Sequence, residues 1–209
     1  MTGAPDRSAR GRGRPRDPET DAAILSAALE LFVERGVEGT SMEQVAKRAG
    51  VGKLTVYRRW SSKEDLLAQA IEQWVRAEVT PSAADVYALR PGDIVERVLP
   101  AAAEMAASPG FRALVARIMG SAVSHPQLMA VYWKHYILPR RELAAAMLRR
   151  AQQDGMVAAD ADLDVLIDMM AGAVTYRVLQ PDPPDAAAML RYLTAVYRHA
   201  GLYPPAADD

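Results

Sequence analysis

A glycine-containing turn between two short helical patterns restricts the fold of this chain more than any other feature. The stretch TSMEQVAKRAGVGKLTVYRRW covers residues 40 to 60. Its glycines at positions 50 and 52 favour a tight turn, because glycine adopts turn conformations easily and weakens a helix interior. Val56 and Trp60 are four residues apart, so they fall on one side of the second helix. The pattern predicts two short helices packed on a common core.

A longer helix is predicted just before this segment, over DPETDAAILSAALELFVERG. Asp17 is a plausible N-cap, Pro18 suits the first helical position, and acidic residues follow in the first turn. Gly36 is the expected C-terminal stop. The apolar residues Ile24, Ala28, Leu31 and Phe32 share one face.

Capping residues mark the helices that follow. Thr40 with Glu43, or Ser41 with Gln44, has the spacing of a capping box. Ser61 or Ser62 then caps another helix, which the sequence extends to about Val79, before Pro81. A supporting helix and two short ones joined by a turn match the helix-turn-helix layout.

The second short helix has a basic outward side. Cations and hydroxyl groups are the side chains that bond DNA phosphates and base edges, so this helix fits the major groove of double-stranded DNA. The alternative is a solvated helix that happens to be basic. The capped neighbours and the glycine turn favour DNA. The outward residues are Lys53, Thr55, Tyr57, Arg58 and Arg59.

Composition favours an all-α protein. Alanine, leucine, valine and methionine dominate, and alternating β-branched runs are scarce. No apolar run has the roughly 18 residues that a membrane span needs, and no signal peptide is expected, so a cytoplasmic location is expected. The chain has no cysteine, which excludes disulfides and thiolate metal sites. No cofactor is implied.

Charge is distributed unevenly along the chain. Residues 1–63 hold 12 Lys and Arg against 8 Asp and Glu, a net of +4, whereas residues 64–209 hold 13 against 18, a net of −5. This asymmetry indicates a part that meets a polyanion and a part that does not.

The segment TSMEQVAKRAGVGKLTVYRRWSSKEDLL resembles the signature of the TetR family of bacterial transcriptional regulators, over about residues 18 to 70. The Thr-Ser cap, Ala-Gly-Val before the second short helix, Tyr57, Trp60 and Lys63 occupy the family's positions. The resemblance implies a three-helix DNA-binding domain and a larger helical domain that binds an effector and dimerises. It also implies roles for single residues. Phosphate contacts fall to Thr40 or Ser41, Tyr57, Arg59 and Lys63, and base-edge contacts to Lys53, Leu54, Thr55 and Arg58.

The N-terminal arm, residues 1–16, is expected to be disordered and basic. Arg12-Gly13-Arg14-Pro15-Arg16 resembles the core of an AT-hook, which lies in the minor groove of AT-rich DNA. A thin glycine-proline backbone can enter that groove, and arginine is attracted by its negative potential. Alternatively, the arm only adds nonspecific attraction to phosphates.

The rest of the chain reads as further helices: one from Pro91-Gly92-Asp93, one over PGFRALVARIMGSAVS, a long one ending at Gly155 with Pro139 inside it, and two more. Proline at 139 predicts a kink, because it removes a hydrogen bond and clashes with the carbonyl of residue 135. The later helix DADLDVLIDMMAGAVTYRVLQ aligns Leu163, Leu166, Ile167, Met170 and Val174. The resemblance implies a homodimer through the last two long helices.

The predicted domains are residues 17–62, which bind DNA, and 63–209, which bind ligand and dimerise. A small, mainly apolar effector is expected beside the Pro139 kink, although plain core packing is an alternative for each pocket residue. His125 and His135 lack a nearby carboxylate at ligand spacing, so no metal site is expected. The candidate pocket residues are Phe111, Met119, Trp133, His135, Tyr136, Met170 and Tyr176.

The favoured function is a ligand-responsive regulator, most often a repressor in this family. One alternative is an architectural DNA-binding protein, which leaves the acidic C-terminal part without a role. The other is an all-helical enzyme. The chain lacks the motifs of a phosphate-binding loop, a zinc protease or a serine hydrolase, so no catalytic residue is assigned.

Overall fold

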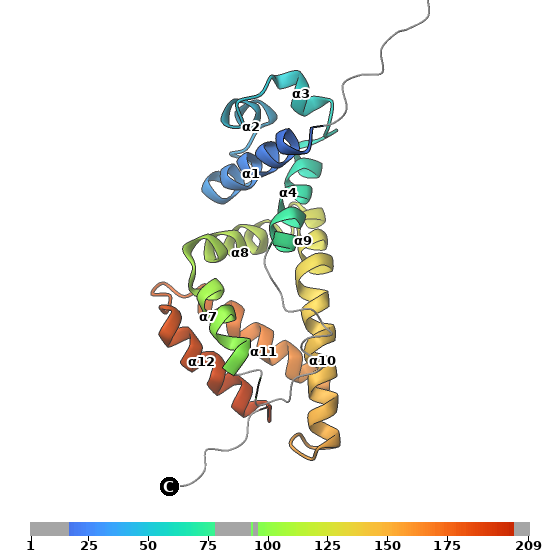
Figure 1. Cartoon of the computed structure of the whole chain (residues 1–209), viewed down its shortest axis with the longest axis vertical. Helices are drawn as coiled ribbons and strands as arrows, with labels where there is room; N and C mark the ends of the chain where they lie inside the picture. The colour runs from blue at the N-terminus through green and yellow to red at the C-terminus, as the bar shows by residue number, and fades with distance from the viewer. Residues whose placement is uncertain (1–16, 78–92, 94–95, 203–209) are drawn as a thin grey trace, which may run out of the picture.

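The structure is a computed structural model and describes residues 17–77, 93 and 96–202. Within these residues the regular structure is entirely helical. The helices labelled α1, α2 and α3 lie at one end of an elongated molecule, and α10 extends to the opposite end (Figure 1). The predicted all-α fold is confirmed, whereas the N-terminal arm lies outside the described residues.

Helix α1 (Pro18–Arg35) begins and ends at the predicted residues. The carboxylate of Asp17 accepts a hydrogen bond from the backbone N–H of Glu19 at 3.2 Å. Gly36 ends the helix with φ of +74°, a conformation that favours glycine. The predicted apolar face is buried, and Ile24, Ala28 and Phe32 are fully inaccessible to solvent.

The two short helices are α2 (Met42–Arg48) and α3 (Lys53–Tyr57), and Gly50 turns the chain between them with φ of +68°. Ser41 and Gln44 form the capping box: Ser41 Oγ accepts from the Gln44 N–H at 3.2 Å, and Gln44 Oε1 accepts from the Ser41 N–H at 2.9 Å. Helix α3 is shorter than its sequence pattern, because the chain turns after Tyr57 and brings Trp60 into the core.

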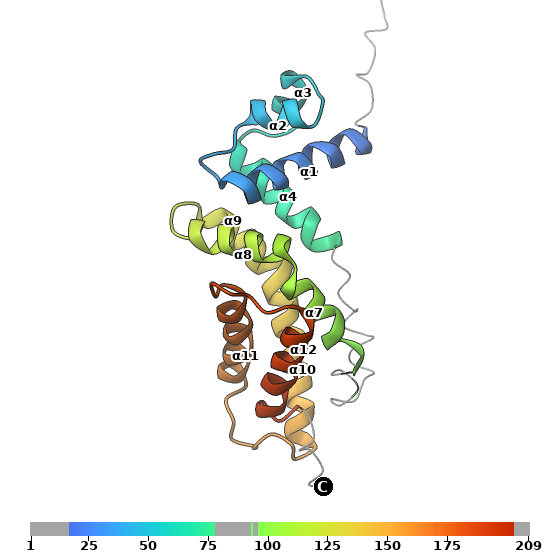
Figure 2. The ribbon, with the colours of Figure 1, turned by 90° about the vertical axis from the view of Figure 1, so that its left-hand side faces the viewer.

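Helix α4 (Lys63–Ala77) leads away from the bundle of α1, α2 and α3 (Figure 2). Ser62 is its cap, since its hydroxyl accepts from the Asp65 N–H at 3.0 Å. The helix buries one face that packs on both α1 and α9 (Pro126–Tyr132). The predicted end near Val79 lies outside the described residues.

The remaining helices form the larger part of the molecule. Helix α12 packs along α7, α8 packs on α1, and α10 packs on α11. The helix expected from Pro91-Gly92-Asp93 begins in a segment that is mostly outside the described residues. The bounds are α7 (Leu99–Ala107), α8 (Pro109–Ser121), α10 (Leu138–Gln153), α11 (Leu163–Val178) and α12 (Ala186–His199).

The disturbance predicted at Pro139 takes the form of a π-helical turn, η1 (Trp133–Ile137), between α9 and α10. The N–H of Leu138 bonds to the carbonyl of Trp133, five residues back instead of four. A wider turn at this point lets the helix continue into α10, where Pro139 stands in the first turn. Such turns are frequent at functional sites.

Two apolar clusters hold the molecule together. The larger joins the buried faces of α1 to α4 with residues of α7, α8, α9, η1, α11 and α12. The smaller lies at the opposite end and includes Leu148 of α10, Ile167 of α11 and Leu202 after α12. Because α4 and α1 share the larger cluster with α8 and α9, the bundle of α1, α2 and α3 is packed directly onto the following helices.

Candidate DNA-binding surface and effector region

The outward side of α3 carries four exposed residues on a firmly held helix. Val56 is fully buried, and Trp60 donates from its indole Nε1 to Gln69 Oε1 of α4 at 2.6 Å. These contacts fix the inner side of the segment. The exposed residues on the other side are Lys53, Leu54, Tyr57 and Arg58.

The side chains of Leu54 and Arg58 differ in chemistry, and both are exposed to solvent. Leu54 is 72% exposed, so its apolar tip is accessible to a partner. Arg58 is exposed, and its guanidinium forms no ion pair with any residue that the structure describes. An apolar tip can contact a thymine methyl group, and a free guanidinium can bond guanine. Thr55 is half-buried and accepts from Arg59 Nη1 through its carbonyl at 3.2 Å.

Lys53 and Tyr57 converge on one carboxylate of α2. The Lys53 ammonium lies 2.6 Å from Glu43 Oε1, and the Tyr57 hydroxyl donates to the same oxygen at 2.8 Å. The hydrogen bond from Lys53, and then that from Tyr57, lower the pKa of Glu43 from 4.5 to about 2. The same carboxylate raises the pKa of Lys53 and of Tyr57.

The sequence pattern gives Glu43 only one possible role, that of a capping-box partner of Thr40. Its partners stand 10 and 14 positions away on the next helix, so no spacing rule within one helix connects them. An acidic residue in the first turn of α2, facing a basic α3, is the signal that could have indicated the contact.

Three residues expected at phosphates have partners inside the protein. Thr40 is only 3% exposed, and its hydroxyl donates to the Gly36 carbonyl at 2.8 Å. Lys63 donates from Nζ to the Val37 carbonyl at 2.9 Å. Arg59 pairs with Asp21 of α1, and its side chain is only 15% exposed. These three therefore hold the helices of the bundle together, whereas Ser41 lies near the surface.

The predicted arm residues Arg12, Arg14 and Arg16 lie outside the described residues.

An aromatic cluster joins α8, α9 and η1 to α4. Trp74 of α4 stacks near Phe111 of α8 and Tyr136 of η1, with ring centroids 6.1 and 6.2 Å away. Tyr136 also stacks on Tyr132 at 4.8 Å. The sequence indicated Phe111 and Tyr136 but missed Trp74, which looks like one more apolar residue of α4 until packing sets it beside them.

Charged and polar side chains border this aromatic cluster. The Arg140 guanidinium lies over the ring of Tyr136, 3.6 Å from its centroid, and Nη1 donates to the Tyr136 carbonyl at 3.2 Å. His135 Nε2 is 3.6 Å from Glu72 Oε1 of α4. Burial raises the pKa of Tyr132.

The other candidate pocket residues do not join this cluster. Met119 is partly buried against the larger core, and Met170 belongs to the smaller core. Trp133 and Tyr176 are 47% and 72% exposed. Among the seven candidates, Phe111 and Tyr136 are brought into ring contact, with centroids 6.0 Å apart.

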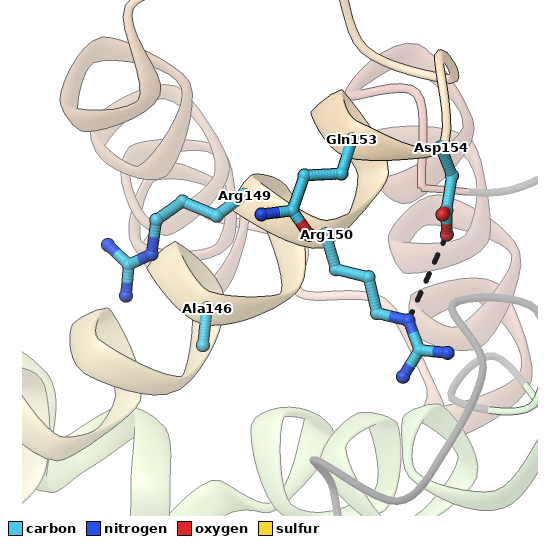
Figure 3. A pocket seen from close by; sticks show the side chains of 5 residues that line it. All are labelled: Ala146, Arg149, Arg150, Gln153 and Asp154. Atoms are coloured by element: carbon cyan, nitrogen blue, oxygen red, sulfur yellow. Dashed lines mark ion pairs between the residues drawn. The ribbon is translucent and has the colours of Figure 1, made fainter.

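A surface hollow beside the last turns of α10 has a different character (Figure 3). An ion pair between Arg150 and Asp154, 3.8 Å apart, borders it. Its lining is mostly charged or polar, unlike the apolar lining typical of effector pockets. It is lined by Ala146, Arg149, Arg150, Gln153 and Asp154.

One side of α11 exposes large apolar residues at helical spacing. Val165, Met169 and Tyr176 are 52%, 65% and 72% exposed, and Gly172 lies between them on the same side. Helix α11 stands at an edge of the molecule (Figure 2). This stripe is unpartnered within the described residues.

The helices in the described part of the chain include none with the length and apolarity that crossing a membrane requires.

Comparisons with known proteins agree with this architecture. Residues 24–70 match the model of bacterial regulatory proteins of the tetR family, and residues 92–196 match the model of the tetracyclin repressor-like C-terminal domain. The HTH-type transcriptional regulator YdeS of Bacillus subtilis (strain 168) is 31% identical over 170 residues, which are 80% of this chain and 82% of that protein.

Two further relatives cover most of the chain. The DNA-binding transcriptional repressor TetR of Mycobacteroides abscessus is 28% identical over 87% of this chain and 93% of its own length. A solved transcriptional regulator from Saccharomonospora viridis, in complex with choline, has a TM-score of 0.71 at 19% identity and covers 88% of this chain and 97% of its own. With a helix-turn-helix bundle at one end and an effector-type helical domain matched along its length, the chain belongs to the TetR family of bacterial transcriptional regulators.

Proposed function

We propose that this chain is a ligand-responsive repressor that binds a palindromic operator as a homodimer and is released by a small, mainly apolar molecule. The observation that carries the proposal is the exposed, basic side of α3 on a buried and capped support. One short recognition helix reads few base pairs, so useful specificity requires two of them on a two-fold symmetric site.

The side chains on α3 divide by chemistry. Arg58 is the candidate for guanine, since its guanidinium is exposed and unpaired within the described residues. Leu54 suits a thymine methyl group. Ser41 is a candidate for a phosphate, and so is Tyr57 once its hydroxyl leaves Glu43. Lys53 is a candidate for a base edge. The arm residues Arg12, Arg14 and Arg16 would reach the minor groove beside the half-sites.

The homodimer is proposed to form through α11 and α12. The apolar stripe of Val165, Met169 and Tyr176 supports this, because an exposed apolar patch marks an interaction surface. Gly172 within the stripe would let the partner helix approach closely. A two-fold axis that passes along this stripe and runs parallel to the long direction of the molecule would place the two α3 helices at the same end of the dimer.

The effector is proposed to enter the aromatic cluster of Trp74, Phe111, Tyr132 and Tyr136. Ligand pockets are mainly apolar and aromatic with a few polar groups, as here. Arg140 already lies on the Tyr136 ring, which disfavours a cationic ligand at that face. A ligand that displaces Trp74 would move α4 and, through it, α3. Its effect is limited by its difference in affinity for the two states, typically about 1–3 kcal/mol.

This function needs binding alone, with no catalysis, and we place the protein in the cytoplasm with the bacterial chromosome.

The test is selection of bound genomic fragments by the purified protein and by the Arg58→Ala variant. We expect fragments that share a palindrome, with half-sites about one helical turn apart, and relaxed preference at one base pair of each half-site for the variant. Arg149→Ala is the matched control, since Arg149 is exposed far away on α10. Fragments without a shared sequence would refute the proposal.

A further inference from the structure

Glu43 is the acidic residue that both Lys53 and Tyr57 contact on the DNA-facing side. One carboxylate oxygen receives the Lys53 ammonium at 2.6 Å and the Tyr57 hydroxyl at 2.8 Å. The ammonium also lies 5.4 Å from the centre of the Tyr57 ring. Lys53, Glu43 and Tyr57 thus form one compact unit across α2 and α3, which we name the Glu43 triad.

The triad treats neutral and anionic acceptors differently. A lysine ammonium has three donors, and Glu43 uses one of them. The other donors can bond a neutral base edge, such as guanine O6 or N7, while the ion pair stays intact. A phosphate at the same ammonium would bring a second negative charge next to the Glu43 carboxylate, and like charges at such distances repel.

Tyr57 is restricted in the same way. A phenol has a single donor, and that of Tyr57 is used by Glu43. To donate to a phosphate, Tyr57 must first leave the carboxylate. The low pKa of Glu43 agrees with a carboxylate that stays charged under all ordinary conditions.

We propose that Glu43 determines specificity by holding Lys53 and Tyr57 back from DNA phosphates, so that it weakens random-sequence binding more than operator binding. The inference rests on the proposed function, since it needs an operator as well as random DNA. Random-sequence binding depends almost wholly on phosphate contacts and counterion release, so it loses most when a cation is neutralised.

The test is Glu43→Gln, which keeps the length and an acceptor oxygen for Tyr57 but removes the charge. Affinity is measured for the operator duplex and for a random-sequence duplex of equal length, over a series of salt concentrations. We expect random-sequence affinity to rise about tenfold at low salt and its salt slope to steepen by about 0.9, the value for one added phosphate contact. Operator affinity should change less, so the specificity ratio falls.

Two comparisons isolate the triad. Glu19→Gln removes the same charge from an exposed position on α1 that touches neither Lys53 nor Tyr57, and it should leave the ratio unchanged. In a Lys53→Met background, Glu43→Gln should no longer steepen the salt slope. Circular dichroism checks that each variant keeps its helices.

An unchanged random-sequence affinity and salt slope in folded Glu43→Gln protein would overturn the inference. Glu43 would then only stabilise the packing of α3 on α2. A gain equal to that of Glu19→Gln would also overturn it, since net charge alone would then explain the result. A wild-type protein without any preferred duplex would refute the proposed function instead, and the random-sequence measurement would still decide whether Glu43 restrains Lys53.

Discussion

Two arginines of α8 hold the ends of two other helices. Arg117 donates to the carbonyls of Val33 and Glu34 at 3.0 and 2.8 Å, at the C-terminal end of α1. Arg112 donates to the carbonyl of Val178, the last residue of α11, at 3.1 Å and to that of Gln180, two residues further on, at 3.0 Å. The last carbonyls of a helix lack partners and carry partial negative charge, so a guanidinium stabilises them. Through these contacts α8 links the DNA-binding bundle to α11.

Replacing Arg117 with methionine should therefore destabilise the protein, because two carbonyls of α1 lose a charged donor. We expect a loss of about 1–3 kcal/mol in the free energy of unfolding, measured by urea denaturation. Arg149→Met, at an exposed position of α10, is the control and should have little effect. Equal stability of both variants would show that the Arg117 contacts are replaced by water at no cost.

The Glu43 carboxyl should titrate near pH 2, well below its ordinary pKa of 4.5, because Lys53 and Tyr57 donate to its charged form. A carboxyl with a lowered folded pKa contributes stability above its unfolded pKa and loses that contribution as pH falls toward the folded value. The window here runs from about pH 4.5 down to about 2. Carboxyl chemical shifts from NMR check this, and in Lys53→Met the pKa should move back toward 4.5.

At the scale of single elements, the capping residues were predicted well from the sequence and the less regular turns were not. A helix cap depends on residues only a few positions apart, so the sequence alone could predict it. The caps at Asp17 and Gly36 and the capping box of Ser41 and Gln44 are examples. The end of α3 and the π turn were not, since packing of Trp60 and the wider turn before Pro139 decide them. The Glu43 contact and the place of Trp74 likewise depend on which helices meet.

Two substitutions of Ser41, the cap of α2, test its role in stability and its role in DNA binding separately. Ser41→Ala removes the side-chain acceptor for the Gln44 N–H and should cost about 1 kcal/mol of stability. Ser41→Asp keeps an acceptor at the cap and should stay as stable as the wild type. Yet it adds a negative charge where a phosphate contact is proposed, so its operator affinity should fall. Thermal unfolding and duplex binding measure the two effects, and unimpaired binding by Ser41→Asp would remove Ser41 from the DNA surface.

At the scale of the whole molecule, the two apolar clusters join different sets of helices. The larger one connects α1 and α4 to α8 and α9. The smaller one supports α11, whose outer stripe is left open to a partner. The sequence predicted the helices of this region but not their division between two apolar clusters. An amphipathic pattern shows which face of a helix is buried, but not which helix packs on that face.

The stripe gives a direct test of assembly. Met169→Asp places a charge in the middle of the proposed interface and should convert a dimer into a monomer with unchanged helical content, as measured by analytical ultracentrifugation. Val123→Asp is the control, since Val123 is 97% exposed in the connection after α8. Operator affinity should fall with the loss of the dimer. A Met169→Asp protein that remains dimeric would place the interface elsewhere.

The π turn has a mechanical consequence for the long helix that contains it. One residue advances an α-helix by about 100° around its axis. The wider turn takes up one residue more than an ordinary α turn, so α10 keeps its rotation about the common axis relative to α9. If the same residues formed a regular α-helix, the extra residue would rotate α10 by about 100° and carry Met147, Leu148 and Ala151 away from the smaller cluster. One residue within Trp133–Ile137 therefore sets the rotational phase between the end of the long helix that meets α4 and the end that supports α11.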